Sequence, residues 1–186
     1  FKKMLIKNYG ISEGKITAVP IYSELRITNY ELRIKKENNK FIFLTVGRLV
    51  PVKNIGMQVR AMKEVVKKYP NTELWIVGDG HEREDLKLQI TNYKLQNHIK
   101  LLGWHNSLEK YYIKADAFLL SSNYEGWGMV IVEAASYSLP IIMTDVGCAG
   151  EIIKDSESGI VIPVGDEKKL KEAMIRLIED KELRIR

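Results

Sequence analysis

The stretch FIFLTVGRLVPVKNIGMQVRAMKEVVKKYPNTELWIVGDG, residues 41–80, holds one full copy of the pattern that decides the fold. A continuous apolar run at 41–46 is followed by a glycine turn, and a second run at 73–77 ends at another glycine turn. Between them, apolar residues recur at i, i+4, i+7 and i+11 from Ile55, which places them on one face of a helix over 55–69. The stretch therefore predicts a strand, a helix and a second strand.

The same pattern continues toward the C-terminal end of the chain. Further strands are predicted at 99–102, 117–120, 140–143 and 159–162. Further helices are predicted at 82–93, 107–114, 129–137 and 167–179. Most strand runs are apolar throughout, as expected for parallel strands that are covered on both faces. The strand–helix units in sequence predict an α/β protein, with a Rossmann-like doubly wound parallel sheet of about six strands.

Length and composition place the chain among ordinary globular proteins. It has 186 residues, of which 45% are hydrophobic and 28% charged, enough for one domain with its own core. The single cysteine, Cys148, excludes an internal disulfide and favours a reducing compartment. The sequence shows neither a signal-peptide pattern nor an apolar run of the ~18 residues that a spanning helix needs. We therefore expect a cytoplasmic location.

The net charge of +5 is confined to one end of the chain. Residues 1–40 carry nine Lys or Arg and four Asp or Glu, whereas residues 41–186 carry twenty of each. A nucleic-acid-binding domain usually shows a broad basic surface. The neutral balance of the larger part argues against a nucleic-acid partner.

Residues 20–40 are distinguished by a short repeat. The segment 24–34 reads ELRITNY-ELRI, and its ITNY core recurs at 90–95. A heptad repeated one and a half times is too short for a coiled coil. We interpret 20–40 as a surface linker without a function of its own.

The loop after the first predicted strand carries candidate anion-binding residues. In open α/β sheets, ligands bind beyond the carboxyl ends of the strands, where the strand order reverses. Gly47 permits a sharp turn there, and Arg48 and Lys53 border the next helix. This arrangement suits a diphosphate, because cations and a helix amino end both favour anions. Two solvated cations on a loop remain the alternative.

The most informative segment, SSNYEGWGM at 121–129, follows the predicted strand at 117–120. Glycines on either side of Trp127 allow backbone N–H groups to approach a ligand at the start of the next helix. Glu125 and Glu133 lie on different elements that face the same crevice, and a carboxylate can accept two hydrogen bonds from a vicinal diol. The segment indicates a nucleotide-sugar site, with an exposed loop acid and a helix acid as the alternative.

Other polar residues give weaker signals. Gly78-Asp79-Gly80 predicts a structural turn, and the glycine turn at 144–151 either lines the same crevice or closes the sheet. Cys148 has no activating cation near it in sequence and is interpreted as a packing residue. The three histidines lack metal-ligand or triad spacing and are interpreted as surface residues: His81, His98 and His105.

Several segments, taken in order, resemble the C-terminal half of family 4 glycosyltransferases, which are retaining enzymes of GT-B architecture. The resemblance covers about 41–180 and rests on GRLVPVKN, WIVGDG, LLGWHNSLEKYY, ADAFLLSSNYEGWGMVIVEAASYSLPIIMTDVGCAGEII and SGIVIPVGD. Glu125 and Glu133 match the family's E-x7-E motif. Val52 stands at a position that is often acidic in the family.

The resemblance implies a role for each candidate residue. Arg48 and Lys53 would hold the donor's diphosphate and stabilise the leaving nucleoside diphosphate. Glu133 would bind the ribose and Glu125 the transferred sugar, so that Arg48, Lys53 and Glu125 form the catalytic set. The base would lie near 101–103. The donor-binding set adds backbone contacts at Gly47, Gly78, Leu102, Gly126, Trp127, Gly128 and Met129.

The resemblance also implies a domain organisation. Residues 1–19 match the last helix (2–9) and strand (15–19) of an N-terminal acceptor-binding domain. Residues 41–186 would be the nucleotide-sugar-binding domain, ending before the helix that usually crosses back to the acceptor half. We expect this donor-binding half to be inactive as a transferase by itself. Its partners would be the nucleotide sugar and the missing N-terminal domain, through which it would associate with the cytoplasmic face of a membrane.

The expected donor is a UDP-, GDP- or ADP-sugar, used without a metal or other cofactor, in polysaccharide or glycolipid biosynthesis. Two other functions stay open from the sequence. One is a sugar-nucleotide 2-epimerase of the same architecture, against which the E-x7-E motif argues. The other is a non-catalytic nucleotide-binding module. The sequence indicates neither the base, the transferred sugar nor the acceptor.

Overall fold

A computed structural model describes Ser12 and residues 40–184 of the chain. The predicted domain remnant at 1–19, apart from Ser12, and the linker with its ELRITNY repeat, apart from Lys40, lie outside the described residues.

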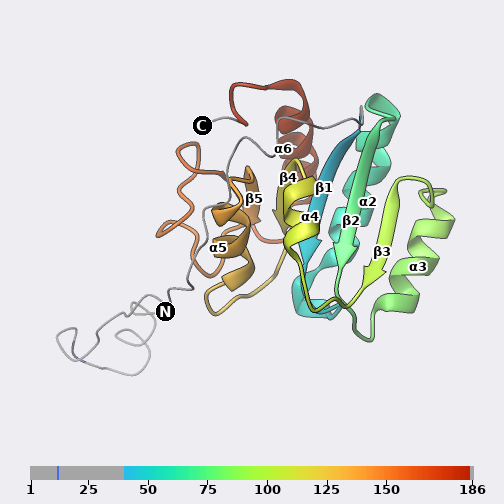
Figure 1. Ribbon diagram of the computed structural model, residues 1–186, viewed down its shortest axis with the longest axis horizontal. Helices are drawn as coiled ribbons and strands as arrows, with labels where there is room; N and C mark the ends of the chain where they lie inside the picture. Colours follow the sequence, from blue (N-terminus) through green and yellow to red (C-terminus); the bar gives the residue numbers. More distant parts are fainter. Residues whose placement is uncertain (1–11, 13–39, 185–186) are drawn as a thin grey trace.

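Six parallel strands form a single sheet in the order β3-β2-β1-β4-β5-β6 (Figure 1). The strands are β1 (Phe41–Val46), β2 (Thr72–Val77), β3 (Ile99–Gly103), β4 (Ala117–Leu120), β5 (Ile141–Thr144) and β6 (Ile160–Ile162). From β1, the strands β2 and β3 follow in order to one edge of the sheet. The chain then returns to place β4 on the other side of β1, and β5 and β6 follow in order to the opposite edge. The predicted doubly wound sheet is confirmed, and its order reverses between β1 and β4.

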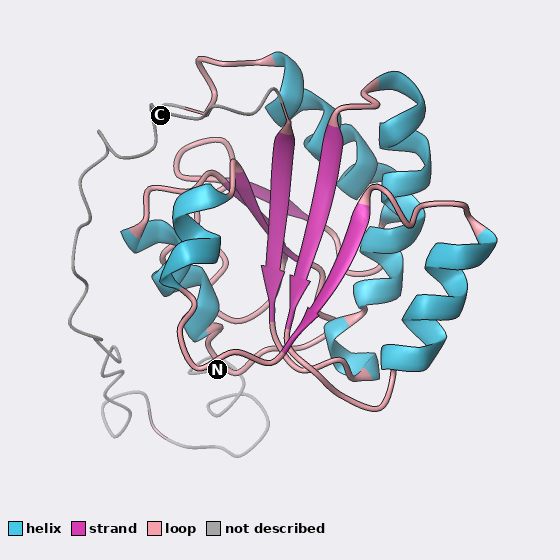
Figure 2. Cartoon of the chain, turned by 45° about the vertical axis from the view of Figure 1, so that its right-hand side comes forward, coloured by secondary structure: helices cyan, strands magenta, loops and turns pink. Residues whose placement is uncertain are grey.

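Helices cover both faces of the sheet (Figure 2). One face packs against α2 (Ile55–Lys68), α3 (Arg83–Asn92) and α6 (Glu167–Glu179). The other packs against α4 (Glu109–Lys114) and α5 (Met129–Ser136). A single 3₁₀ turn, η3 (Pro51–Lys53), connects β1 to α2.

The middle of β1 shows why the strand runs are apolar throughout. Phe43 and Leu44 are both fully buried, Phe43 in the core on the α2 side and Leu44 in the core on the α4 side. Successive side chains of a strand point to opposite faces, so a strand covered on both faces needs apolar residues at every position.

About half of the observed boundaries coincide with the predicted ones, and the others differ by one or two residues. The strand predicted at 140–143 begins at Ile141, because Pro140 has no N–H to donate, although its carbonyl accepts a hydrogen bond from Phe118 N. The strand predicted at 99–102 continues to Gly103, whose carbonyl accepts from Gly78 N. The helix predicted at 107–114 begins at Glu109.

A charge cluster around the buried Glu73 lies near the amino end of β2. Glu73 is only 3% exposed and accepts hydrogen bonds from Lys40 Nζ (2.5 Å), Lys100 Nζ (2.7 Å) and Trp75 Nε1 (2.8 Å). Burial raises the pKa of Glu73, but the hydrogen bonds from Lys100, Lys40 and Trp75 outweigh it and lower the pKa to about 2. The cluster therefore stabilises the fold only while Glu73 is ionised.

We expect the free energy of unfolding to fall as the pH drops from about 5 toward 2, because the pKa of Glu73 is lower folded than unfolded (about 4.3). Glu73→Gln should cost about 1–3 kcal/mol at neutral pH and make this loss shallower. Urea unfolding between pH 3 and pH 7 measures both effects. Glu84→Gln is the control, since Glu84 is exposed and 3.7 Å from its lysine partner. Equal pH slopes for Glu73→Gln and the unsubstituted chain would contradict the assignment.

Among the described residues, none of the helices combines the length and the apolar character needed to cross a membrane.

Candidate functional site

The loops that follow β1 and β4 meet at the point where the strand order reverses. Asn123 N donates to Val52 O (2.7 Å), which joins the two loops through their backbones. The buried Ser121 Oγ lies 2.9 Å from Lys53 O, and Gln58 Nε2 donates to that same hydroxyl oxygen (2.8 Å). Polar side chains under the loops thus hold the predicted diphosphate loop against the segment at 121–129.

Backbone hydrogen bonds also join the other loops at this edge. Gly78 N donates to Gly103 O (2.8 Å), which links the ends of β2 and β3. Leu49 N donates to Asp79 O (2.9 Å), which links the loops after β1 and β2. The loops after β4 and β5 are joined by a bond from Cys148 N to Trp127 O (3.0 Å). The carboxyl ends of five neighbouring strands are thus connected in a row, here called the loop row.

Gly78 makes part of the loop row possible. Its φ is 137°, and a Cβ atom there would lie 1.9 Å from the carbonyl oxygen of Gly47. Only glycine readily tolerates both the conformation and the contact. Gly78 is buried and joins two loops, as the predicted structural turn requires.

Lys53 and Glu125, placed by sequence on different parts of a donor, contact each other directly. Lys53 Nζ lies 2.5 Å from Glu125 Oε1, with side chains 20% and 11% exposed. Ser122 Oγ donates to the same carboxylate oxygen (2.7 Å), and the carbonyl of Ser122 is fixed by Thr144 Oγ1 (2.7 Å). The ion pair spans 72 residues of sequence, and no local pattern pointed to it or to Ser122.

Glu133, on α5, is held by a residue that the sequence did not single out. Its Oε2 accepts a hydrogen bond from the hydroxyl of Tyr112, on α4 (2.8 Å). The ring of Tyr112 is buried and stacks on Tyr137, with centroids 5.0 Å apart. Burial, followed by the charge and hydrogen bond of Glu133, raises the pKa of Tyr112. The phenol therefore stays protonated and acts as the hydrogen-bond donor to Glu133. Of the two carboxylate oxygens, Oε2 is the one that Tyr112 engages.

The remaining cation of the predicted site, Arg48, is exposed in the loop after β1. Four of the described helices begin at this edge without a side-chain cap, α2, α3, α4 and α5. Among them, α2 and α5 follow residues with positive φ, Asn54 and Gly128. The first N–H groups of an uncapped helix are available to an anion and lie at its positive end. Arg48 and these helix ends therefore place positive charge beside the Lys53–Glu125 ion pair.

The segment Gly126–Met129 combines an open backbone with a packed side chain. A Cβ atom at Gly126 would meet nothing within 4 Å, so the backbone there is open to a ligand. The side chain of Trp127 packs instead against the core on the α4 side. Trp127 therefore anchors the loop, whereas the neighbouring Gly126 is exposed.

The end of β3, predicted to contact the base, is fixed by side chains on both sides. Arg83 Nη2 donates to Leu101 O (3.4 Å), and His105 Nε2 lies 3.1 Å from Leu102 O. The side chain of Leu102 is partly buried against the core on the α4 side. Arg83 and His105 were not predicted to shape this segment.

The burial of Cys148 supports its interpretation as a packing residue. Its side chain is fully buried, and burial raises the pKa of the thiol, which is therefore uncharged at neutral pH. His98 is half-buried, with Nδ1 3.2 Å from Thr72 O, and His105 is likewise half-buried, so only His81 is the exposed surface residue predicted for all three.

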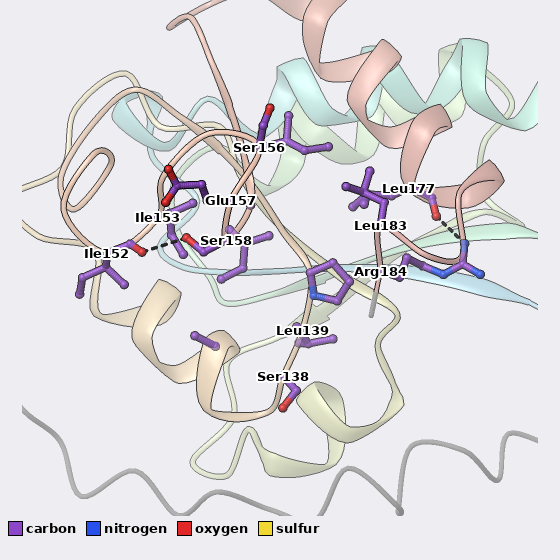
Figure 3. A pocket seen from close by; sticks show the side chains of 15 residues that line it. Ser138, Leu139, Ile152, Ile153, Ser156, Glu157, Ser158, Leu177, Leu183 and Arg184 are labelled. Carbon is purple, nitrogen blue, oxygen red and sulfur yellow. Dashed lines mark hydrogen bonds between the residues drawn. The ribbon is translucent and has the colours of Figure 1, made fainter. Parts of the chain in front are cut away.

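A cavity of about 400 Å³ lies away from these residues. Figure 3 shows its lining around Leu139, the Ile152–Ser158 loop and Arg184. It includes the first residues of β5 and β6, at the amino edge of the sheet, and none of the candidate donor-binding residues. Arg184 closes one side by donating to the carbonyls of Leu177 and Ile178.

Solved structures define the class to which the domain belongs. The fold matches S. aureus TarM, in complex with fondaparinux, alpha-GlcNAc-glycerol and UDP, with a TM-score of 0.87 over 99% of this chain and 36% of that one, at 19% identity. It also matches the C-terminal domain of LpcC, a glycosyl transferase group 1 protein from Francisella tularensis (TM-score 0.71, 22% identity, 89% of this chain and 87% of that one). The domain is a Rossmann-like half of the GT-B fold.

The family follows from the sequence comparison. The profile of the family described as Glycosyl transferases group 1 matches residues 28–186, and the chain belongs to that family. The resemblance drawn from the motifs is thereby confirmed.

Two relatives carry information about substrates. An E. coli protein named UDP-Gal:alpha-D-GlcNAc-diphosphoundecaprenol alpha-1,3-galactosyltransferase is 31% identical over 195 residues, 99% of this chain and 50% of that protein. Anabaena HepE, in complex with UDP and glucose, is 26% identical with a TM-score of 0.74, over 79% of this chain and 41% of that one. The chain spans about half the length of such curated relatives.

Proposed function

We propose that this chain is the donor-binding half of a retaining glycosyltransferase, which moves a sugar from a nucleoside diphosphate sugar to an acceptor. The observation that carries the proposal is the meeting of Lys53, Glu125 and the uncapped start of α5 at the switch point of the sheet. A cation, a carboxylate and free backbone N–H groups are the groups that a diphosphate linked to a sugar requires.

Lys53 and Arg48 would stabilise the leaving nucleoside diphosphate. Negative charge grows on the diphosphate as its bond to the sugar breaks, and cations placed beforehand lower the energy of that transition state. Lys53 is four-fifths buried, which reduces solvent screening, whereas Arg48 is exposed. We therefore expect Lys53 to contribute more than Arg48.

The two carboxylates would hold the two sugars of the donor. Glu133 is oriented by Tyr112 and would bind the ribose diol. Glu125 is paired with Lys53 and Ser122 in the structure, and would exchange part of that contact for hydroxyls of the transferred sugar when a diphosphate attracts Lys53. Binding of the diphosphate and of the sugar would thus be coupled through this ion pair.

The proposed donor is a UDP-sugar. The E. coli relative is named for UDP-Gal, and the HepE structure contains UDP and glucose. By the same reasoning the acceptor would be a lipid-linked saccharide, as in the diphosphoundecaprenol compound in the name of the E. coli relative. The acceptor would be held by another part of the whole protein, with the reaction at a membrane surface.

The test is a calorimetric titration with UDP, GDP, ADP and UDP-glucose, supported by thermal shift. A ligand at a hundred times its Kd should stabilise the fold by about 2.7 kcal/mol. Glu133→Gln should weaken both UDP and UDP-glucose, since ribose is common to both. Glu125→Gln should leave UDP binding unchanged or tighter, because Lys53 is released, and weaken only UDP-glucose.

Absence of binding by all these nucleotides would refute the proposal. Identical profiles for the two variants would instead show that at least one carboxylate is misassigned. Glu157→Gln, at an exposed acid near the amino edge of the sheet, is the matched control and should not change either affinity.

A further inference from the structure

We propose that the indole of Trp104 stacks on the base of the bound nucleotide and thereby increases the affinity of the domain for its donor. The inference rests on the proposed function and adds a side-chain contact to it. Trp104 follows β3 directly, at the carboxyl edge of the sheet, and is 69% exposed. Among the described large hydrophobic residues it is the most exposed.

The ribose contact determines where the base can lie. Tyr112, which holds the ribose carboxylate Glu133, belongs to α4. The neighbouring Tyr111 packs against the ring of His105, with centroids 5.0 Å apart, so the loop between β3 and α4 lies against the start of that helix. Since the base is bonded directly to the ribose, a nucleotide held by Glu133 would extend its base toward this loop.

The last residues of β3, which lead into this loop, are already engaged. The carbonyls of Leu101, Leu102 and Gly103 each have a protein hydrogen-bonding group within reach: Arg83 Nη2 (3.4 Å), His105 Nε2 (3.1 Å) and Gly78 N (2.8 Å), respectively. These contacts fix the end of β3 from which the loop starts, and the contact of His105 with Leu102 O ties the loop back to the strand. Trp104 is the residue of this loop that offers a large apolar ring to solvent.

A held backbone and an exposed ring form a platform suited to stacking. Every nucleobase has an aromatic face, so stacking adds affinity with little dependence on the base. The indole loses little conformational freedom on binding when the backbone beneath it is already fixed. Trp104 would therefore strengthen nucleotide binding generally, whereas discrimination among bases would come from hydrogen bonds elsewhere.

The test compares Trp104→Ala, Trp104→Phe and Leu88→Ala in the intact chain. Leu88 is 60% exposed on α3 and serves as the control for loss of an exposed apolar side chain. The probes are UDP and inorganic pyrophosphate, measured by calorimetry. Trp104→Ala should weaken UDP binding about 5- to 150-fold and leave pyrophosphate binding unchanged. Trp104→Phe should retain most of the UDP affinity, and Leu88→Ala all of it.

Two results would overturn the inference while leaving the proposed function intact. One is unchanged UDP affinity in Trp104→Ala, which would assign the exposed ring to another surface, such as the acceptor-binding part of the protein. The other is an equal loss for UDP and pyrophosphate, which would show an effect on the diphosphate loops. Failure of the unsubstituted chain to bind UDP, GDP and ADP would overturn the proposed function and this inference together.

Discussion

The Lys53→Ala variant is expected to bind UDP at least 10- to 150-fold more weakly than the unsubstituted chain, from the ~1.5–3 kcal/mol of a charge-assisted contact. The loss should exceed that of Arg48→Ala for a structural reason. Removal of Lys53 deletes a cation and also leaves the carboxylate of Glu125, whose side chain is 11% exposed, without its ion-pair partner beside the diphosphate. That uncompensated negative charge repels the ligand.

A double variant separates these two effects. Lys53→Ala combined with Glu125→Gln should recover part of the UDP affinity, because the repelling charge is gone. Calorimetry with UDP and uridine measures the result, and uridine should bind equally to all variants since it lacks the diphosphate. Lys154→Ala is the control, as Lys154 is exposed and 3.8 Å from its partner Glu157. Equal losses of affinity for UDP and uridine would show that Lys53 does not contact the diphosphate.

The Gly78→Ala variant is expected to lose ~3 kcal/mol or more of folding stability. The added Cβ atom would lie 1.9 Å from Gly47 O at a φ of 137°, so the loops after β1 and β2 must move apart. Gly126→Ala is the matched control, because its Cβ atom would meet nothing within 4 Å, and its stability should change by less than about 1 kcal/mol. Urea unfolding of the two variants gives the comparison.

The same substitution should also weaken UDP binding, since the displaced Gly47 begins the loop that carries Arg48 and Lys53. A Gly78→Ala protein as stable as Gly126→Ala would mean that the loops can separate freely. In that case Gly78 would have no part in fixing the site.

The six strands and the five longer helices were predictable because each carries its own local signal. Apolar runs such as 41–46 and the helical spacing from Ile55 depend only on neighbours in sequence. The placement of β4 beside β1 depends on packing between segments far apart in the chain, and sequence periodicity carries no information about it. The general rule for doubly wound sheets nevertheless located the candidate residues at strand ends.

The contacts within the site were less predictable. Glu125 and Glu133 were identified from their own loop and helix, but the pairing of Glu125 with Lys53 requires β4 and β1 to be adjacent. The bond from Tyr112 to Glu133 requires α4 and α5 to share one face of the sheet. In LEKYY, at 108–112, the two tyrosines read as apolar residues of a helix, and nothing local distinguishes the one that reaches a carboxylate.

The loop row limits how this edge of the domain can change in evolution or in the laboratory. An inserted residue after β1, β2 or β4 would displace a backbone group that its neighbour needs, so the disturbance would reach the next loop as well. The exposed segment at 154–158, between β5 and β6, carries no link of the loop row and can absorb a change of length. A new donor preference is therefore most readily obtained by substituting side chains while the lengths of these loops stay constant. Inserted loops are best placed at 154–158.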